Sequence, residues 1–190
     1  MDTQTTLIVL TVAVALAALV VVGLVFARSA RSKRTEHLRE RFGPEYDRVV
    51  AEHGSPRKAE ARLEEREKRV DKLNIRPVPP ELHDRFVSSW RQVQARFVDE
   101  PSAAVGEADG LVRMVMGSRG YPMGSFEQRE ADVSVDHPHV VASYRAAHEI
   151  ALRRERGEAS TEDLRRAFLH YRELFKELLE VPELVEAKQA

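Results

Sequence analysis

The stretch STEDLRRAFLHYRELFKELL, residues 160–179, decides the fold class. Its apolar side chains recur at spacings of three and four residues: Leu164, Phe168, Tyr171, Phe175 and Leu178. Such spacing places them on one face of an α-helix, and helices in bundles pack through faces of this kind. Ser160 and Asp163 flank the start of the pattern and form an imperfect capping box, which predicts that the helix begins there.

The region 81–181 contains three further patterns of this kind. One of them places Leu82, Phe86, Trp90, Val93 and Phe97 on a single face. A second begins near Pro101 and a third begins at Pro138. No interval alternates apolar and polar residues over the length of a strand. The chain is therefore predicted to be all-α, with a small soluble bundle of about four helices. Residues 182–190 are predicted to form a frayed tail.

The interval GYPMGSFEQREADVSVDHPH, residues 120–139, shows no helical period, so an irregular loop is predicted over residues 117–137. Loops of this length in compact domains tend to be functional or packed by their own side chains. We expect this one first to cross between pairs of helices and second to be the partner-binding surface. The candidate residues of that surface are Tyr121, Met123 and Phe126.

The same interval holds the candidates for a mixed nitrogen and oxygen metal site: Asp132, Asp136, His137 and His139. The favoured interpretation is that Asp136 caps the next helix while both histidines lie at the surface. His148 is expected to be a core histidine. The spacings of di-iron bundles, HExxH zinc sites, P-loops and serine elbows are absent, and the chain has no cysteine. No catalytic residue or cofactor is predicted, and the chain is not expected to be an enzyme.

Residues 7–27, LIVLTVAVALAALVVVGLVFA, contain no charged side chain. At about 1.5 Å per residue such a helix spans roughly 31 Å, which matches the hydrocarbon core of a bilayer. A transmembrane helix is predicted here. The alternative is a cleaved signal peptide, but residues 1–6 contain no basic side chain and the apolar stretch is longer than such signals need.

A basic cluster follows the span directly: Arg28, Arg31, Lys33 and Arg34. The positive-inside rule therefore places the bulk of the chain, together with this juxtamembrane segment of residues 28–34, in the cytoplasm and residues 1–6 outside. The cluster is also a candidate contact for anionic lipid, although a topology signal alone is the favoured interpretation. Ala13 and Ala17 form a weak small-xxx-small pattern through which two spans could pack as a homo-oligomer.

Residues 35–75 are rich in charge, with few apolar positions. Ser55 is expected to cap a long helix that ion pairs such as Glu64 with Lys68 support on its surface. A charged helical stalk is predicted over residues 35–75. For the helix that Ser55 caps, a surface helix that lies on the bundle and a coiled-coil seam for a partner are equally good interpretations. RPVPP, residues 76–80, is predicted to be a linker and a domain boundary.

The charge balance argues against nucleic acid as a partner. The chain has 30 Lys and Arg and 31 Asp and Glu, and of these only Asp2 precedes the basic cluster. The part that follows the predicted span is therefore electrically neutral, whereas phosphate binding favours a net basic surface.

Four stretches together resemble a family of uncharacterised short bacterial proteins: LRERFGPEYDRVV (38–50), RGYP (119–122), VDHPHVVASYRAAHEIA (135–151) and ASTEDLRRAFLHYRELF (159–175). The resemblance covers essentially the whole chain. It implies one N-terminal transmembrane helix in the bacterial inner membrane and a charged helical cytoplasmic region, and it implies no activity or ligand.

The sequence thus predicts a single-pass membrane protein that presents an interaction or scaffold module to an unknown protein partner. The alternatives are a membrane-tethered metal-binding protein or enzyme that uses residues 120–139, and an anionic-lipid-responsive tether.

Overall fold

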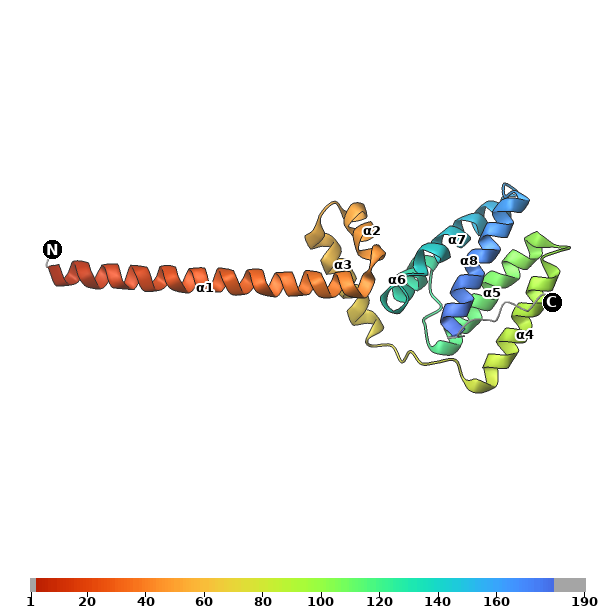
Figure 1. Ribbon diagram of the computed structural model, residues 1–190, viewed down its shortest axis with the longest axis horizontal. Coiled ribbons are helices and arrows are strands. Elements are labelled where there is room, and N and C mark those ends of the chain that lie inside the picture. The colour runs from red at the N-terminus through yellow and green to blue at the C-terminus, as the bar shows by residue number, and fades with distance from the viewer. Residues whose placement is uncertain (1–2, 180–190) are drawn as a thin grey trace, which may run out of the picture. The chain divides into compact units, whose positions relative to one another are not determined.

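The computed structural model describes the backbone of residues 3–179, and the side chains of residues 31–179 together with a few earlier ones. Within residues 3–179 the regular structure is helical throughout and no strand occurs (Figure 1). The predicted all-α class is confirmed. The tail predicted at residues 182–190 lies outside the described residues.

Two compact units make up the chain, residues 1–40 and residues 41–190. Helix α1, Thr3–Phe42, contains the described residues of the first unit and continues without a break past the basic cluster into the first two residues of the second. Across the side chains that are described, no helix has the length and apolar character needed to cross a membrane. The span predicted at residues 7–27 lies largely outside those side chains, so it stays a prediction.

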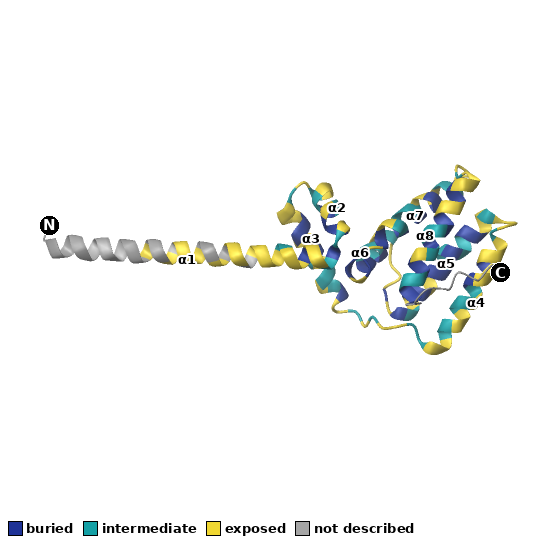
Figure 2. Ribbon diagram, in the orientation of Figure 1, coloured by how far each residue is buried: buried dark blue, intermediate teal, exposed yellow. Residues whose placement is uncertain are grey.

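The second unit contains α2 (Pro44–His53), α3 (Pro56–Val70), α4 (Pro80–Arg96), α5 (Pro101–Arg119), α6 (Phe126–Asp136), α7 (Val141–Glu155) and α8 (Thr161–Leu179). Helix α8 packs against both α5 and α7, and α4 packs on α5. Each of these helices contains buried residues, whose positions along the ribbon are dark blue in Figure 2. At the centre, Trp90 of α4 stacks on Phe168 and Phe175 of α8, with ring centroids 5.1 and 4.7 Å apart.

Side-chain caps fix the starts of several helices. Ser160 Oγ accepts a hydrogen bond from the Asp163 backbone N–H at 3.1 Å, and the Asp163 carboxylate accepts one from the Ser160 N–H at 3.0 Å. The predicted capping box is therefore confirmed, with Asp in the place of the usual Glu. Ser55 likewise accepts from the Lys58 N–H at 3.3 Å at the start of α3, as expected.

The prediction of an irregular loop over residues 117–137 is wrong. Helix α5 continues to Arg119, and α6 occupies the second half of the interval. Ser125 begins α6 by accepting a hydrogen bond from the Gln128 N–H at 3.3 Å. Asp136 therefore ends α6 and does not cap α7, which starts at Val141. Between residues 80 and 179 the bundle has five helices, one more than predicted.

Residues 74–79 form no helix, as the linker prediction required. They do not separate two domains, however, because the chain on both sides belongs to the second unit. The Arg76 N–H donates a hydrogen bond of 2.9 Å to the Arg119 carbonyl at the end of α5. Next to it, Gly120 has φ 99°, and a Cβ there would lie 2.6 Å from the Asn74 carbonyl oxygen. The linker is thus held against the end of α5.

Helices α2 and α3 do not form a free stalk. Helix α2 packs on α3, and α3 packs on α6. The apolar side chains Tyr46, Val49 and Leu63 are buried between them. For α3, the structure therefore supports the interpretation as a surface helix that lies on the bundle.

Candidate functional site

A buried carboxylate lies at the centre of a cluster of ion pairs that joins four helices of the second unit. The Glu45 side chain, in the first turn of α2, has no exposed surface. It accepts hydrogen bonds from Arg48 at 2.7 and 2.9 Å, from Arg66 of α3 at 3.0 Å and from Arg145 of α7 at 2.8 Å. Glu130 of α6 pairs with Arg48 and Arg145 in turn. We call these five residues the Glu45 cluster.

The arginines keep Glu45 ionised. Burial alone would raise the pKa of Glu45, but hydrogen bonds and charges from Arg48 and Arg145 outweigh burial and lower the pKa to about 2. The pairing with Glu45 raises the pKa of Arg48. A carboxylate with so low a pKa is a poor general base and carries no proton near neutral pH. The Glu45 cluster is therefore suited to holding helices together and not to catalysis.

A second buried carboxylate ties α3 to α6. Asp132 has no exposed side-chain surface and accepts a hydrogen bond from Arg69 at 2.8 Å and from Gln128 at 3.0 Å. Nearby, Arg66 also donates to Ser134 Oγ at 3.1 Å. Asp132 is thus occupied by an arginine, which makes it unsuited to bind a cation.

Asp136, the other carboxylate of the metal hypothesis, accepts hydrogen bonds of 3.2 Å from both Arg41 and the Tyr121 hydroxyl. Asp136 and the two histidines do not converge on a common point at which a metal ion could bind. In the described part of the chain, no group of three His, Cys, Asp or Glu residues is placed to hold a metal ion.

The two histidines of the metal hypothesis instead meet a residue that the sequence analysis missed. Glu177 of α8 binds His137 Nδ1 through one oxygen at 2.8 Å and His139 Nε2 through the other at 3.0 Å. Burial acts to raise the pKa of Glu177, but its two histidine partners lower it overall. His137 is buried, contrary to the expectation that both histidines lie at the surface. This contact fixes the α6–α7 turn on α8.

Only some of the residues predicted to form the partner-binding surface are exposed. Tyr121 is buried, and burial together with the neighbouring Asp136 charge raises the pKa of its hydroxyl. It therefore cannot belong to an exposed surface. Met123 is 44% exposed, and Phe126 is half-buried. Both remain accessible to a partner, and whether one binds there stays a prediction.

Phe126 stacks on His148 of α7, with ring centroids 3.6 Å apart and planes 12° from parallel. His148 is half-buried, so the expectation of a core histidine is wrong, and it lies at the edge of the core. Burial lowers the pKa of His148, which keeps the stacked ring neutral near pH 7.

Two more apolar side chains extend this exposed edge. Met114, 57% exposed, lies on α5 one turn before Gly117, and Met123 Sδ would be 3.6 Å from a Cβ placed on Gly117. Leu152, 42% exposed, lies one turn beyond His148 on α7. We define the Met123 edge as Met114, Met123, Phe126, His148 and Leu152.

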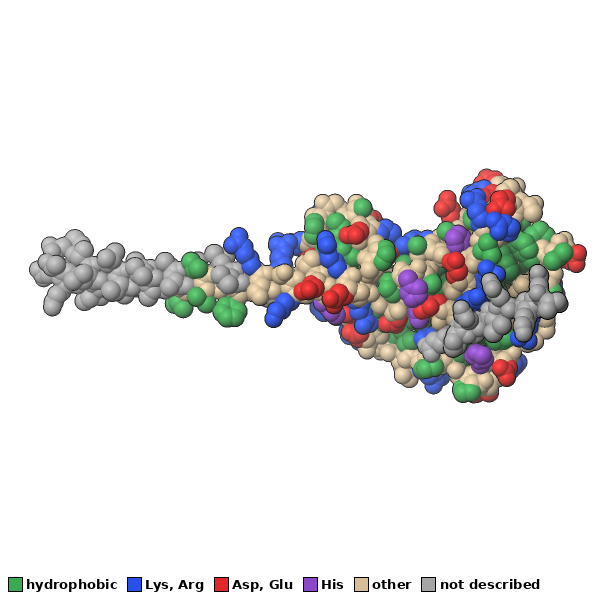
Figure 3. Space-filling view, viewed as in Figure 1, with side chains coloured by type: hydrophobic (Ala, Val, Ile, Leu, Met, Phe, Trp, Pro, Cys, Tyr) green, Lys and Arg blue, Asp and Glu red, His purple; other side chains and the backbone are tan. Residues whose placement is uncertain are grey.

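The basic cluster of the first unit projects from α1. Arg28, Arg31, Lys33 and Arg34 are all exposed, and Figure 3 shows basic side chains around this helix. Arg28 and Arg31 line a hollow of about 700 Å³ together with Thr35 and Arg39. Cations arranged on several sides of one helix provide an electrostatic surface and no enclosed site.

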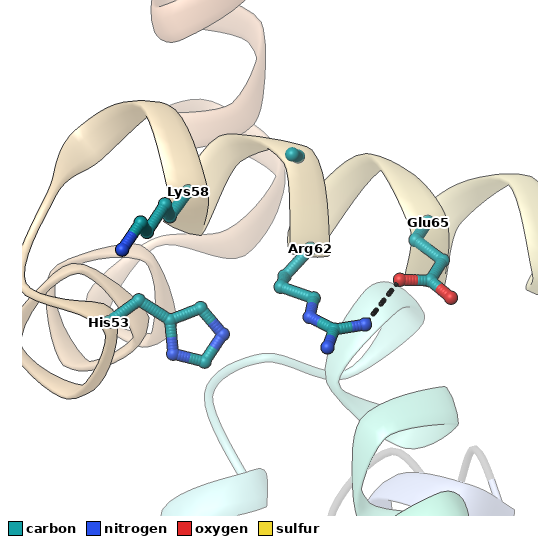
Figure 4. A pocket seen from close by; sticks show the side chains of 5 residues that line it. His53, Lys58, Arg62 and Glu65 are labelled. Carbon is teal, nitrogen blue, oxygen red and sulfur yellow. Dashed lines mark hydrogen bonds and ion pairs between the residues drawn. The ribbon is translucent and has the colours of Figure 1, made fainter.

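A second charged hollow lies in the second unit, between the end of α2 and the outer side of α3. His53, Lys58, Arg62 and Glu65 line it, and its volume is about 560 Å³. Figure 4 shows the His53 ring and the Lys58 and Arg62 side chains around the same space, with Arg62 paired to Glu65. In the sequence, each of these residues resembles an ordinary solvated side chain, so none of them was predicted to line a site.

Comparison with protein-family models, with curated proteins and with solved structures finds no match to this chain. The resemblance to a bacterial family therefore stays a prediction, and the function must be inferred from the molecule itself.

Proposed function

We propose that the protein is a single-pass protein of the bacterial inner membrane that presents residues 41–190 to the cytoplasm as a protein-interaction or scaffold module. The observation that carries the interaction role is the Met123 edge. It combines two exposed methionines, Met114 and Met123, with the stacked pair of Phe126 and His148 in a domain rich in charged side chains. Clustered exposed apolar side chains mark interaction sites, and methionine adapts readily to different partner surfaces.

The chemistry of the titratable groups supports binding over catalysis. The two carboxylates whose pKa values are lowered most, Glu45 and Asp163, are both held by arginines. Asp163 additionally serves as part of a helix cap. The pKa values of these two carboxylates are therefore lowered by contacts that stabilise helices and their packing, and structural ion pairs of this kind perturb pKa values without any role in catalysis.

Membrane anchoring rests on the uncharged residues 7–27 and on the basic cluster that follows them. Helix α1 continues past the basic cluster to Phe42. At about 1.5 Å per residue, residues 28–40 extend roughly 20 Å beyond the predicted span.

The interaction role is tested by site-specific photo-crosslinking in living cells. A benzophenone amino acid at Met123, or at Met114, is expected to give one discrete adduct with a partner or with a second copy of the chain. The matched control position is Val98, which is 82% exposed in the turn between α4 and α5 and lies outside the Met123 edge. Adducts of equal yield from all three positions, or no adduct from either methionine, would contradict the proposal.

A further inference from the structure

The outer side of α3 carries mainly positive charge. The hollow beside His53 adjoins another of about 470 Å³, since Ala61 and Glu65 line both. The basic residues that line the two hollows are Lys58, Arg62, Lys68, Arg69 and Lys72, and the acidic ones are Glu64 and Glu65. Among the residues that line the two hollows, basic side chains therefore outnumber acidic ones by five to two.

The ion pairs around α3 leave its lysines uncompensated. Arg69, which the sequence would pair with Glu65 one turn away, turns instead to the buried Asp132. Glu65 pairs with Arg62, at 2.8 Å, and both side chains are about 60% exposed, so water weakens this pair. Among the described residues, no ion pair engages Lys58, Lys68 or Lys72.

We propose that this surface, which we call the α3 basic face and define as Lys58, Arg62, Lys68 and Lys72, is the docking site for an acidic helical segment of a protein partner. From Lys58 to Lys68, α3 rises roughly 15 Å at about 1.5 Å per residue, and Lys72 lies in the turn that follows the end of α3 at Val70. A partner helix with pairs of carboxylates at i and i+4 presents charges at the four-residue spacing that separates Lys58 from Arg62 and Lys68 from Lys72. The proposal rests on the interaction role proposed above and adds the chemistry of the partner.

Two features favour a protein segment over other polyanions. The adjoining hollows, of about 560 and 470 Å³, can receive side chains, whereas a flat lipid surface would leave them unfilled. Glu65 lies in the middle of the face and would repel an uninterrupted row of phosphates. A partner helix can place a neutral or basic residue opposite Glu65 and acidic residues opposite the lysines. It can therefore complement both the negative and the positive charges of this face.

The test uses the full chain in detergent micelles and a fluorescein-labelled synthetic helical peptide of about fifteen residues with Glu at every fourth position. The comparison probe has Gln in place of each Glu. Fluorescence anisotropy is expected to show binding of the Glu peptide only, with affinity that falls as salt rises. Lys58→Gln, Lys68→Gln and Lys72→Gln together are expected to weaken binding about tenfold, because exposed ion pairs contribute modestly and add.

The matched control is Arg85→Gln with Arg91→Gln, which removes two exposed charges of α4 and is expected to leave peptide binding unchanged. Equal loss in the control and lysine variants, or equal binding of the Glu and Gln peptides, would overturn the proposal. Preferential binding of phosphatidylglycerol vesicles or duplex DNA, lost in the lysine variant, would also overturn it. A crosslinked partner at Met123 that is insensitive to the lysine substitutions would reject this inference and leave the interaction role intact.

Discussion

At the scale of single residues, Glu45 is expected to be the side chain whose charge matters most for stability. Glu45→Gln should lower the free energy of unfolding by about 3 kcal/mol, since it leaves Arg48, Arg66 and Arg145 around a neutral buried group. Trp90 is the single tryptophan and is buried, so its fluorescence reports the transition in denaturant titrations of the full chain in micelles. Glu52→Gln, which removes an exposed partner of Arg48, should change stability by less than about 0.5 kcal/mol.

The same carboxylate predicts how stability depends on pH. Its pKa is about 2 in the folded chain against an ordinary value of 4.5. A lowered pKa stabilises the fold above pH 4.5, and this contribution is lost as the pH falls from 4.5 towards 2. Stability measured over that range should decline less steeply in Glu45→Gln than in the natural chain. Parallel pH profiles would show that Glu45 is not the group responsible.

The Glu45 cluster also shows what the sequence could not provide. In the stretch PEYDRVV, residues 44–50, Glu45 looks like an ordinary surface residue in the first turn of a helix. Its partner Arg145 is 100 residues away, and no local spacing links the two. The pairing of Glu177 with His137 and His139 was missed for the same reason, because ion pairs between distant segments follow from the packing and leave no periodic pattern.

At the scale of the elements, two glycines predict opposite effects of the same substitution. Gly120→Ala should destabilise the chain by more than about 1 kcal/mol, because φ is 99° and the new Cβ would meet the Asn74 carbonyl oxygen. Gly110→Ala, inside α5 with nothing within 4 Å of the new Cβ, should stabilise it by up to about 1 kcal/mol. Thermal unfolding followed by circular dichroism measures both. A lower melting temperature for Gly110→Ala would contradict the expectation for α5.

Apolar periodicity predicted α4, α5 and α8 because those helices bury apolar faces against one another. It missed α6 because that helix buries a mainly polar face, with Arg129, Asp132 and Ser134 beside Val133. Those polar side chains are satisfied by partners on α3 and α7, so burial does not require an apolar stripe. Glycines and prolines on both sides of α6 further suggested a loop.

At the scale of the whole molecule, the predicted stalk and linker show which features of the fold amino-acid composition can predict and which it cannot. Proline at residues 77 and 79 correctly indicated a segment without helix, whereas Pro80, which the prediction included in the linker, begins α4. The prolines could not indicate that this segment is held against α5 by the Arg76–Arg119 hydrogen bond. High charge in α3 suggested solvent exposure, yet Arg66 and Arg69 use that charge to dock α3 on α6. A charged helix is thus compatible with both a free stalk and a docked helix.

The arrangement of the chain in the membrane can be tested because the natural chain contains no cysteine. We expect a membrane-impermeant maleimide to label Thr3→Cys in intact cells, and to label Ala103→Cys, an exposed position of α5, only after lysis. In the proposed arrangement, the basic cluster retains the segment after the predicted span on the cytoplasmic side, as the positive-inside rule requires. Replacement of Arg28, Arg31, Lys33 and Arg34 by Gln should make the labelling of both positions mixed.

Three outcomes would contradict this arrangement in different ways. Labelling of Ala103→Cys alone in intact cells would show the inverted orientation. Recovery of the chain in the soluble fraction would remove the anchor altogether. A mature mass lacking residues 1–27 would identify that segment as a cleaved signal, because a true anchor must remain attached to the charged domain that it holds at the membrane.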